Sequence, residues 1–323
     1  MRLLFSTVFL GLVWFAAVNL VLSGAAWLLA LRVAARDRRG DGARAQVLLA
    51  LRLLPAALAL LTAAALFVPA HWTLEPRDVD ERFGVTLGVL ACVGAALVIR
   101  ALVRAVQVAR AALRVGACLR AAQPGMTSRL RHDPPAVEVT GLDGISLAGV
   151  IRPCVLIGTR VREALSAAEL DVAVAHETAH YRAQDNLKRV AMFCAPDLLG
   201  LSAAGRWLEA SWRAEAECLA DSRAVGGDDE RAMSLASALV KVAILGGRKG
   251  PLNAAVWSTF HEALLLETRV RRLVDGAHQP VRAERSGVLG TVALTIVVLA
   301  SAWLAGLPQQ LHRVTEVVVQ SLP

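Results

Sequence analysis

The sequence predicts a mainly α-helical membrane protein that also carries one soluble-type α+β domain with a small β-sheet. First, 56% of the 323 residues are hydrophobic and the mean hydropathy is +0.52, whereas soluble domains have about 45–50% apolar residues. Second, the excess lies in four runs, each long enough to cross a hydrocarbon core of about 30 Å as a helix. Third, residues 115–283, between the third and fourth runs, have the mixed composition of a soluble domain.

The four runs divide the chain into three parts. Residues 1–114 form a three-helix membrane region, 115–283 form the soluble-type domain, and 284–323 hold the fourth helix and a short tail. The first run is too long for the apolar part of a signal peptide and shows no convincing cleavage site, although a cleaved signal is the alternative. The predicted transmembrane spans are about 3–31, 47–70, 83–103 and 287–307.

Charged residues in the loops predict the orientation of the helices. Five arginines between positions 32 and 44 place the first loop in the cytoplasm, because short positively charged loops stay inside. The acidic segment 71–82 is then extracytoplasmic, and both chain termini lie outside. The soluble-type domain is therefore cytoplasmic. Arg52, near the cytoplasmic end of the second helix, is expected to extend its charged end to the membrane surface.

The net charge of +8 makes nucleic-acid binding the usual alternative to a membrane role. The arginines, however, cluster beside the apolar runs, and no aromatic–basic binding motif is present. We therefore expect the lipid bilayer as a partner and no direct contact with nucleic acid. The five cysteines have no paired spacing, which argues against a disulfide framework.

The soluble-type domain is organised around the sequence His-Glu-Thr-Ala-His at 176–180. Ser166 and Glu169 form a capping-box pattern, so a helix is predicted to begin at Ser166 and to continue through His180. Histidines four residues apart lie on one face of a helix and can bind one Zn²⁺ at about 2.0–2.1 Å. Glu177 between them can act as general base on water activated by the ion. The alternative is a pair of hydrogen-bonded core histidines.

A zinc site of this kind needs a third protein ligand and an open fourth position. Glu217 is the candidate ligand, in a helix predicted over 204–224, and Asp221 follows it on the same helix face. Asp221 is expected to accept the second N–H of a ligand histidine and so to fix its tautomer. Glu215 is the rival ligand, but it points to the other side of the helix. The alternative for Glu217 and Asp221 is a solvated charged face.

His-Glu-x-x-His followed by Glu-x-x-x-Asp resembles the gluzincin metallopeptidases of membranes, which include the BlaR/MecR-type antirepressor peptidases and the Ste24/HtpX-type peptidases. Residues 152–225, about a quarter of the chain, resemble the first family more closely. Its sensory members carry a penicillin-binding-like domain after the last membrane helix, and residues 308–323 are too few for one. The segments that carry the resemblance are Pro153–Gly158, Leu165–Leu170 and His180–Leu187.

The resemblance implies a zinc-dependent endopeptidase of a bacterial-type inner membrane, with Zn²⁺ held by His176, His180 and Glu217. The expected substrate is a protein or peptide, namely a cytoplasmic transcriptional repressor or the enzyme itself. A homodimer is left open. Two alternatives stand beside this reading: an HtpX-like quality-control protease and a non-catalytic membrane scaffold. Glu177 argues against the scaffold, because binding zinc requires the histidines but not that carboxylate.

Three strands are predicted before the motif, over 136–140, 145–150 and 154–158, the first two forming a hairpin. In this class of peptidase an edge strand beside the zinc helix binds substrate as an added strand. We expect that role for the hairpin or for the third strand, which consists of Cys154, Val155, Leu156, Ile157 and Gly158.

The remaining predictions concern single residues and later segments. Asp185 is expected to hydrogen-bond within the site or to cap a helix. Tyr181 and His261 are candidate donors to the oxyanion, and His261 is also an alternative ligand. Segment 188–205, broken by Pro196, either lies at the membrane surface or is buried in the domain. Trp207 and Trp212 are expected either to anchor at the membrane interface or to join the core, and helices are predicted over 231–245 and 254–274.

Overall fold

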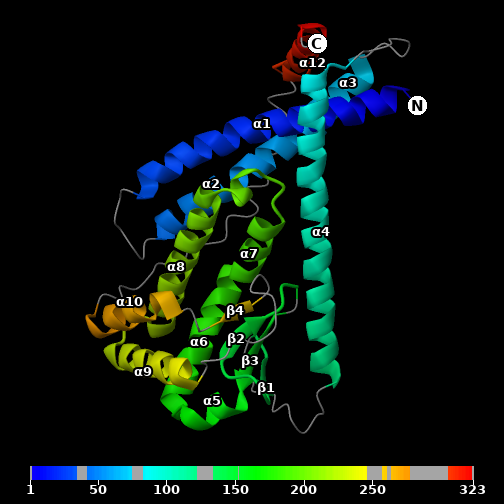
Figure 1. Cartoon of the computed structure of the whole chain (residues 1–323). Coiled ribbons are helices and arrows are strands. Elements are labelled where there is room, and N and C mark those ends of the chain that lie inside the picture. The colour runs from blue at the N-terminus through cyan, green and yellow to red at the C-terminus, as the bar shows by residue number, and fades with distance from the viewer. Residues whose placement is uncertain are drawn as a thin grey trace.

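The computed structural model describes residues 2–34, 42–74, 83–121, 134–151, 153–245, 257–259, 263–276 and 305–321. Three long helical segments build the membrane region. They are α1 (Arg2–Ala34), α2 (Gly42–Leu61), which continues through a π-helical turn into α3 (Val68–Leu74), and α4 (Val85–Ala121). Helix α12 (Leu307–Ser321) lies against their upper ends, where Trp14 Nε1 donates to Thr315 Oγ1 at 2.9 Å (Figure 1).

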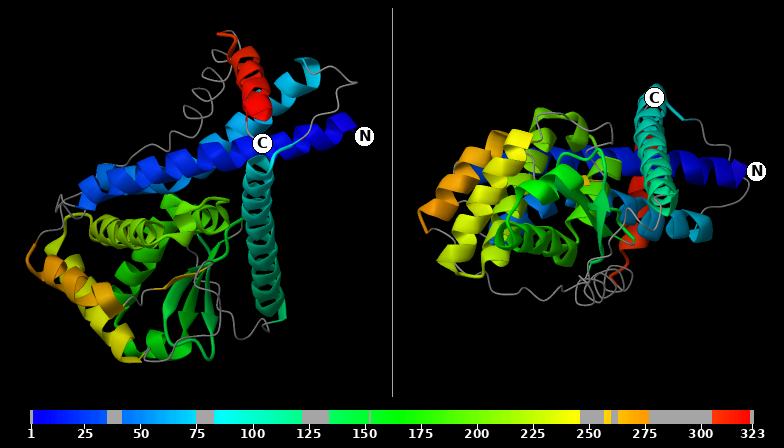
Figure 2. Two further views of the ribbon diagram at one scale, coloured as in Figure 1. Left: turned by 45° about the horizontal axis from the view of Figure 1, so that its top comes forward. Right: turned by 90° about the horizontal axis from the view of Figure 1, so that it is seen from below.

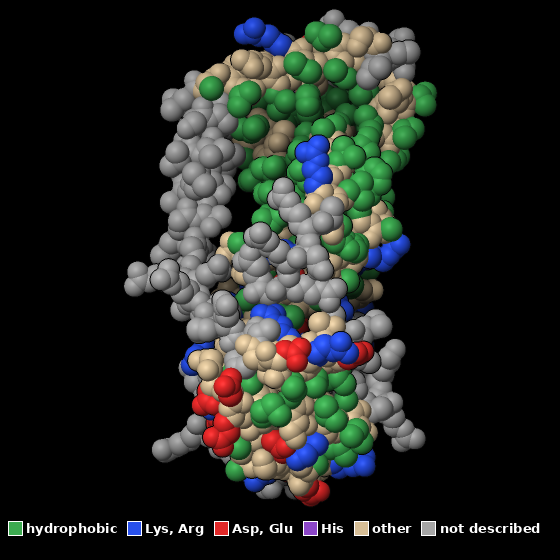
Figure 3. All heavy atoms as spheres, turned by 90° about the vertical axis from the view of Figure 1, so that its left-hand side faces the viewer, with side chains coloured by type: hydrophobic (Ala, Val, Ile, Leu, Met, Phe, Trp, Pro, Cys, Tyr) green, Lys and Arg blue, Asp and Glu red, His purple; other side chains and the backbone are tan. Residues whose placement is uncertain are grey.

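Three helices of the described chain are long and apolar enough to cross a membrane: Leu3–Ala34, Gly42–Leu74 and Val85–Gly116. They correspond to the first three predicted spans. On the face drawn in Figure 3, hydrophobic side chains cover most of the upper half, whereas acidic side chains gather on the lower half. The fourth predicted span, 287–307, falls almost entirely outside the described residues. The three long apolar helices indicate that the chain is a membrane protein.

Helix α4 joins the membrane region to the soluble-type domain. The N-terminal half of α4 crosses α1 at close range. A Cβ atom at Gly94 would lie 2.5 Å from the carbonyl oxygen of Leu12, so only glycine fits there. Its C-terminal half continues alongside the β-sheet (Figures 1 and 2). There Val115 is buried in one cluster with Ala148 and Leu156 of the sheet.

The domain consists of a small sheet and a layer of helices. The helices are α5 (Thr159–Ala164), α6 (Ala167–Ala183), α7 (Asp185–Cys194), α8 (Ala203–Val225), α9 (Asp229–Leu245) and α10 (Ala263–Val274). The strands are β1 (Ala136–Val139), β2 (Ile145–Ala148), β3 (Cys154–Gly158) and β4 (Trp257–Thr259). The predicted helix over 231–245 is present. The one over 254–274 is wrong in its first part, because β4 pairs with β2 there.

The order of strands in the sheet is β1-β3-β2-β4. Strand β1 runs parallel to β3, and β2 runs antiparallel to both β3 and β4. The predicted hairpin of the first two strands is therefore wrong. The prediction that Cys154–Gly158 is an edge strand is also wrong, since β3 lies between β1 and β2. All five residues of β3 are buried, which is the burial pattern of an interior strand.

Helix α6 begins where the capping box predicts. Ser166 Oγ accepts from the Glu169 amide at 3.3 Å, and Glu169 Oε2 accepts from the Ser166 amide at 2.7 Å. The helix ends at Gln184, whose φ of 56° is left-handed, and α7 starts at the next residue. Val172, Ala173 and Val174 are buried against the sheet and α9. The sharp turn at Gln184 brings the start of α7 back beside the end of α6.

Residues 192–200, which comprise the end of α7 and the start of its connection to α8, are bound by the membrane helices. Arg52 of α2 is fully buried and contacts Asp197 Oδ2 at 2.6 Å, Glu209 Oε1 at 2.7 Å and the Met192 carbonyl at 2.8 Å. The guanidinium of Arg52 is therefore paired inside the protein and not exposed to water. Further contacts come from Asn19, Arg100 and Arg104, which bind the backbone of Pro196, Leu198, Asp197, Ala195 and Phe193.

The segment predicted over 188–205 therefore lies between the membrane helices and the domain. Trp212, on the following helix α8, is 2% exposed, and Trp207 packs against the same hydrophobic cluster. Both tryptophans thus serve core packing.

Replacing Asp197 by Ala should destabilise the protein by about 3–5 kcal/mol, because it leaves the buried Arg52 guanidinium without its closest counter-charge. Thermal unfolding of the detergent-solubilised protein measures this change. The matched control is Asp171→Ala, which removes an exposed pair with Arg231 and should cost about 0–1 kcal/mol. Equal losses in the two variants would contradict the assignment of Arg52 and Asp197 as a buried structural pair.

Candidate metal centre

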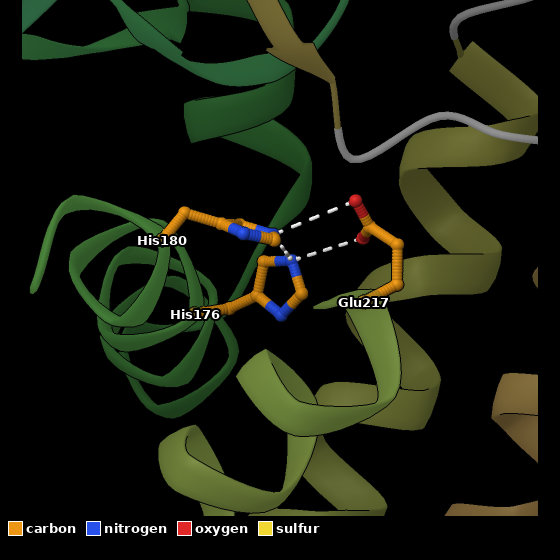
Figure 4. A group of neighbouring side chains, drawn as sticks. All are labelled: His176, His180 and Glu217. Carbon is orange, nitrogen blue, oxygen red and sulfur yellow. Dashed lines mark hydrogen bonds and ion pairs between the residues drawn. The ribbon is translucent and has the colours of Figure 1, made fainter. Parts of the chain in front are cut away.

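Helices α6 and α8 bring three possible metal ligands together (Figure 4). His176 and His180 are fully buried on α6, and Glu217 on α8 is 1% exposed. His176 Nε2 lies 3.1 Å from His180 Nε2 and 3.4 Å from Glu217 Oε2. His180 Nε2 lies 3.5 Å from Glu217 Oε1. The triad predicted from the spacing therefore exists, and it could hold a metal ion.

The distances between these atoms are compatible with a small metal ion. Ligand atoms bound at about 2.0–2.1 Å with tetrahedral angles lie roughly 3.3 Å apart. The two Nε2 atoms lie 3.1 Å apart, while His176 Nε2 lies 3.4 Å from Oε2 of Glu217 and His180 Nε2 lies 3.5 Å from Oε1. The two imidazoles thus face different oxygens of one carboxylate, and the three side chains could hold an ion.

Two further carboxylates fix the orientation of the imidazoles. Asp221 Oδ1 lies 2.9 Å from His176 Nδ1, and Asp185 Oδ2 lies 2.8 Å from His180 Nδ1. Because a carboxylate only accepts, the hydrogen bond to Asp185 places a proton on Nδ1 of His180. The 2.9 Å contact with Asp221 favours the same tautomer for His176. Both Nε2 lone pairs then face one another at 3.1 Å. This arrangement requires a cation between them, either a proton or a metal ion.

The buried charges of the centre also favour a divalent cation. Four carboxylates and two guanidinium groups are each at most 7% exposed, namely Glu177, Asp185, Glu217, Asp221, Arg189 and Arg269. With all six ionised, two negative charges are uncompensated, and one divalent ion neutralises them. Lys188 also contacts Asp185, at 3.1 Å, but the lysine side chain is 35% exposed and is therefore not counted among the buried charges. Isolated charges are costly in a buried site, so these groups need the ion or bound protons.

In the ion-free state, bound protons take the place of the ion. Burial lowers the pKa of His180, but Glu217 and Asp185 outweigh it and raise the pKa to about 10. Burial opposes protonation of His176 as well, yet Asp221 and Glu217 raise its pKa. Although burial alone would raise the pKa of Glu217, His180 and Arg269 hold it well below its ordinary value. Protonation of the imidazole pair at Nε2 is therefore favoured in the ion-free state, and an incoming ion displaces that proton.

Glu177 lies beside the triad and is fully buried. Its Oε2 accepts from the backbone amide of Leu147 in β2 at 2.8 Å. Among the described residues, its Oε1 has no hydrogen-bond partner. Burial raises the pKa of Glu177 to about 6, partly opposed by the charges of His176 and His180. Glu177 is thus a carboxylate with one oxygen fixed by the sheet and one available for proton transfer near neutral pH.

The structure also places the other predicted site residues. Glu217 and Asp221 are buried, so the alternative of a solvated charged face is wrong. Glu215 turns away and pairs with Arg44 at 3.3 Å. Tyr181 and His180 line a cavity of about 370 Å³ with residues of β2 and α7. His261 lies outside the described residues.

Three residues of the centre were not singled out as site residues from the sequence. Arg269 of α10 and Arg189 of α7 both approach Glu217, at 3.0 and 3.2 Å. Asn186 donates to the carbonyls of Leu147 and Gly149 at 3.0 and 2.9 Å, which fixes the end of β2. The signal for Asn186 is its place directly after Asp185, whereas Arg189 and Arg269 carry no local signal.

Comparison with known proteins adds no assignment: no family model matches the chain, and no curated protein is significantly similar to it.

Binding of a divalent ion should release at least one proton near neutral pH, because the ion takes the place of the proton between the Nε2 atoms of His176 and His180. Calorimetry in buffers of different ionisation enthalpy measures this number. The same raised pKa values stabilise the ion-free fold below pH 6.5, the ordinary histidine value, and this stabilisation is lost as pH rises towards about 10.

Thermal unfolding with a chelator should therefore show decreasing stability over that pH window, and the metal-loaded protein should not show it. Ion binding without proton release, together with a flat pH profile, would contradict the described protonation.

Proposed function

We propose that this chain is an integral-membrane, zinc-dependent metalloendopeptidase, with signalling proteolysis of a cytoplasmic repressor, of itself or of both as its role. One observation carries the proposal. Glu177 lies beside the buried His176–His180–Glu217 triad, with one carboxylate oxygen bound to a strand and the other unpaired among the described residues. A purely structural metal site needs no such carboxylate, whereas hydrolysis requires a general base at that position.

The residues divide the chemistry between them. His176, His180 and Glu217 would hold Zn²⁺, which when bound would supply Lewis acidity and lower the pKa of a water molecule towards neutrality. Glu177 takes the proton of the attacking water and passes it to the leaving amine, for which a pKa of about 6 is suitable. Asp221 and Asp185 keep the two imidazoles in the Nδ1-protonated tautomer. Burial excludes bulk water and strengthens each of these interactions.

Strand β2 is the candidate peptide-binding element. Its Leu147 binds Glu177, so a peptide paired with β2 has its backbone close to the general base. The cavity of about 370 Å³ beside His180, bounded by Leu147, Tyr181 and Leu187, offers room for a substrate side chain. Strand β2 belongs to the segment 136–150 for which, as the alternative to Cys154–Gly158, peptide binding was predicted.

In this structure β4 of the same chain occupies that edge. Leu147 pairs with Ser258, and Ala148 pairs with Trp257, in antiparallel register. A segment of the protein therefore lies where a substrate strand is expected, and this supports the enzyme itself as one substrate. The cytoplasmic repressor rests on the resemblance to the BlaR/MecR-type peptidases and on the arginine-rich first loop.

Glu177→Gln should abolish proteolysis and leave zinc binding intact, because the amide keeps the shape but cannot take the proton. Co-expression with a candidate repressor followed by immunoblotting measures cleavage, and elemental analysis measures bound zinc. The matched control is Glu163→Gln, an exposed glutamate on α5, which should behave as wild type. Cleavage that persists in the Glu177→Gln protein would sink the peptidase proposal.

Self-cleavage, where it occurs, should fall within or beside Trp257–Thr259, because that strand lies along β2 next to Glu177. Incubation of the purified protein with Zn²⁺ and mass spectrometry of the fragments locates the cut. The fragments should be absent with a chelator and in the Glu177→Gln variant. A zinc-dependent cut far from β4 would show that its pairing with β2 has no role in self-cleavage.

A further inference from the structure

Arg269 of α10 is a buried cation in contact with the metal centre. It is 2% exposed, and its guanidinium forms a bidentate pair with Asp221: Nε lies 2.7 Å from Oδ2, and Nη2 lies 2.6 Å from Oδ1. Its third nitrogen, Nη1, lies 3.0 Å from Glu217 Oε2. Nη2 also lies 3.5 Å from Nε2 of His176. One side chain thus touches the third ligand and the carboxylate that orients a histidine ligand.

The bidentate pair determines how Asp221 is presented to His176. Asp221 Oδ1 accepts from Arg269 and also lies 2.9 Å from His176 Nδ1. A planar guanidinium holds a carboxylate in one plane, which a single ammonium group does not do. The orientation of the His176 ring therefore depends on a residue that lies 93 positions away in the sequence.

Charge gives Arg269 a second effect. Asp221 and Glu217 lie one helical turn apart on α8, and both are buried. Two neighbouring carboxylates repel one another unless a cation lies between them. Arg269 contacts both, and Arg189 contacts the other oxygen of Glu217 at 3.2 Å. With Arg269 in place, the centre is neutralised by one divalent ion.

We propose that Arg269 is a positioning residue of the metal centre. Its guanidinium orients Asp221, and through it His176, and offsets the charge of Asp221 and Glu217. Metal binding accordingly depends on the docking of α10 against α8, although α10 supplies no ligand among the described residues. The inference requires the metal site on which the proposed function rests, but it does not require peptidase activity.

The test uses the full-length protein in detergent, stripped of metal with a chelator. Zn²⁺ affinity is measured by competition titration, and the visible absorption of bound Co²⁺ reports the ligand geometry. Arg269→Gln should weaken Zn²⁺ binding about 10–100-fold and change the Co²⁺ spectrum. The control is Arg271→Gln, an exposed position on the same helix, whose side chain is 71% exposed. It should leave both readouts unchanged.

A second pair of variants separates positioning from general support of the fold. The double variant Asp221→Asn with Arg269→Gln removes both charges, so its loss of affinity should be smaller than the combined losses of the single variants. Arg269→Lys keeps the charge but not the fork, and it should bind Zn²⁺ with an altered Co²⁺ spectrum. This variant decides the matter if Arg269→Gln does not fold.

Wild-type Zn²⁺ affinity and a wild-type Co²⁺ spectrum in both Arg269→Gln and Arg269→Lys would overturn the inference. A double variant whose loss of binding free energy equals the sum of the two single losses would overturn it as well. A wild-type protein that binds Zn²⁺ but cleaves no substrate would instead refute the proposed function and leave Arg269 to be judged by these measurements.

Discussion

The structure depends on the facing lone pairs of two imidazoles in a buried site. His176 and His180 each direct Nδ1 at a carboxylate, so their Nε2 atoms meet at 3.1 Å with Glu217 beside them. Such a group is stable only with positive charge at its centre. The elements around it serve this requirement: α6 supplies the imidazoles, α8 supplies two carboxylates, α7 supplies Asp185, and α10 supplies Arg269.

The same elements connect the centre to the membrane region. Segment 192–200 leads from α7 to α8, and Arg52, Asn19 and Arg100 of the membrane helices bind it. Helix α4 adds a second connection through its contact with the sheet. A shift of the membrane helices would therefore reach both helices that follow the motif. The membrane helices are thus in direct contact with the chain that leads to the ligand-bearing helix α8.

Local sequence signals predicted the parts of the site that depend on helical geometry. The capping box at Ser166 set the start of α6, and the spacing of four residues placed His176 with His180 and Glu217 with Asp221. Long apolar runs gave the three membrane helices that the structure describes. Strand order was not predictable in this way, because an apolar run such as Cys154–Gly158 shows burial but not its neighbours. The structural roles of Arg52 and Arg269 were not predicted, because the carboxylates that pair with them lie more than 40 residues away in the sequence.

The central claim is that two imidazoles and one carboxylate enclose a single divalent ion, and X-ray absorption at the zinc edge of the purified protein tests it most directly. The account predicts about one zinc per chain with two nitrogen neighbours at about 2.0–2.1 Å and only oxygen as the other ligands. Sulfur neighbours, or a protein that takes up no stoichiometric metal, would contradict it.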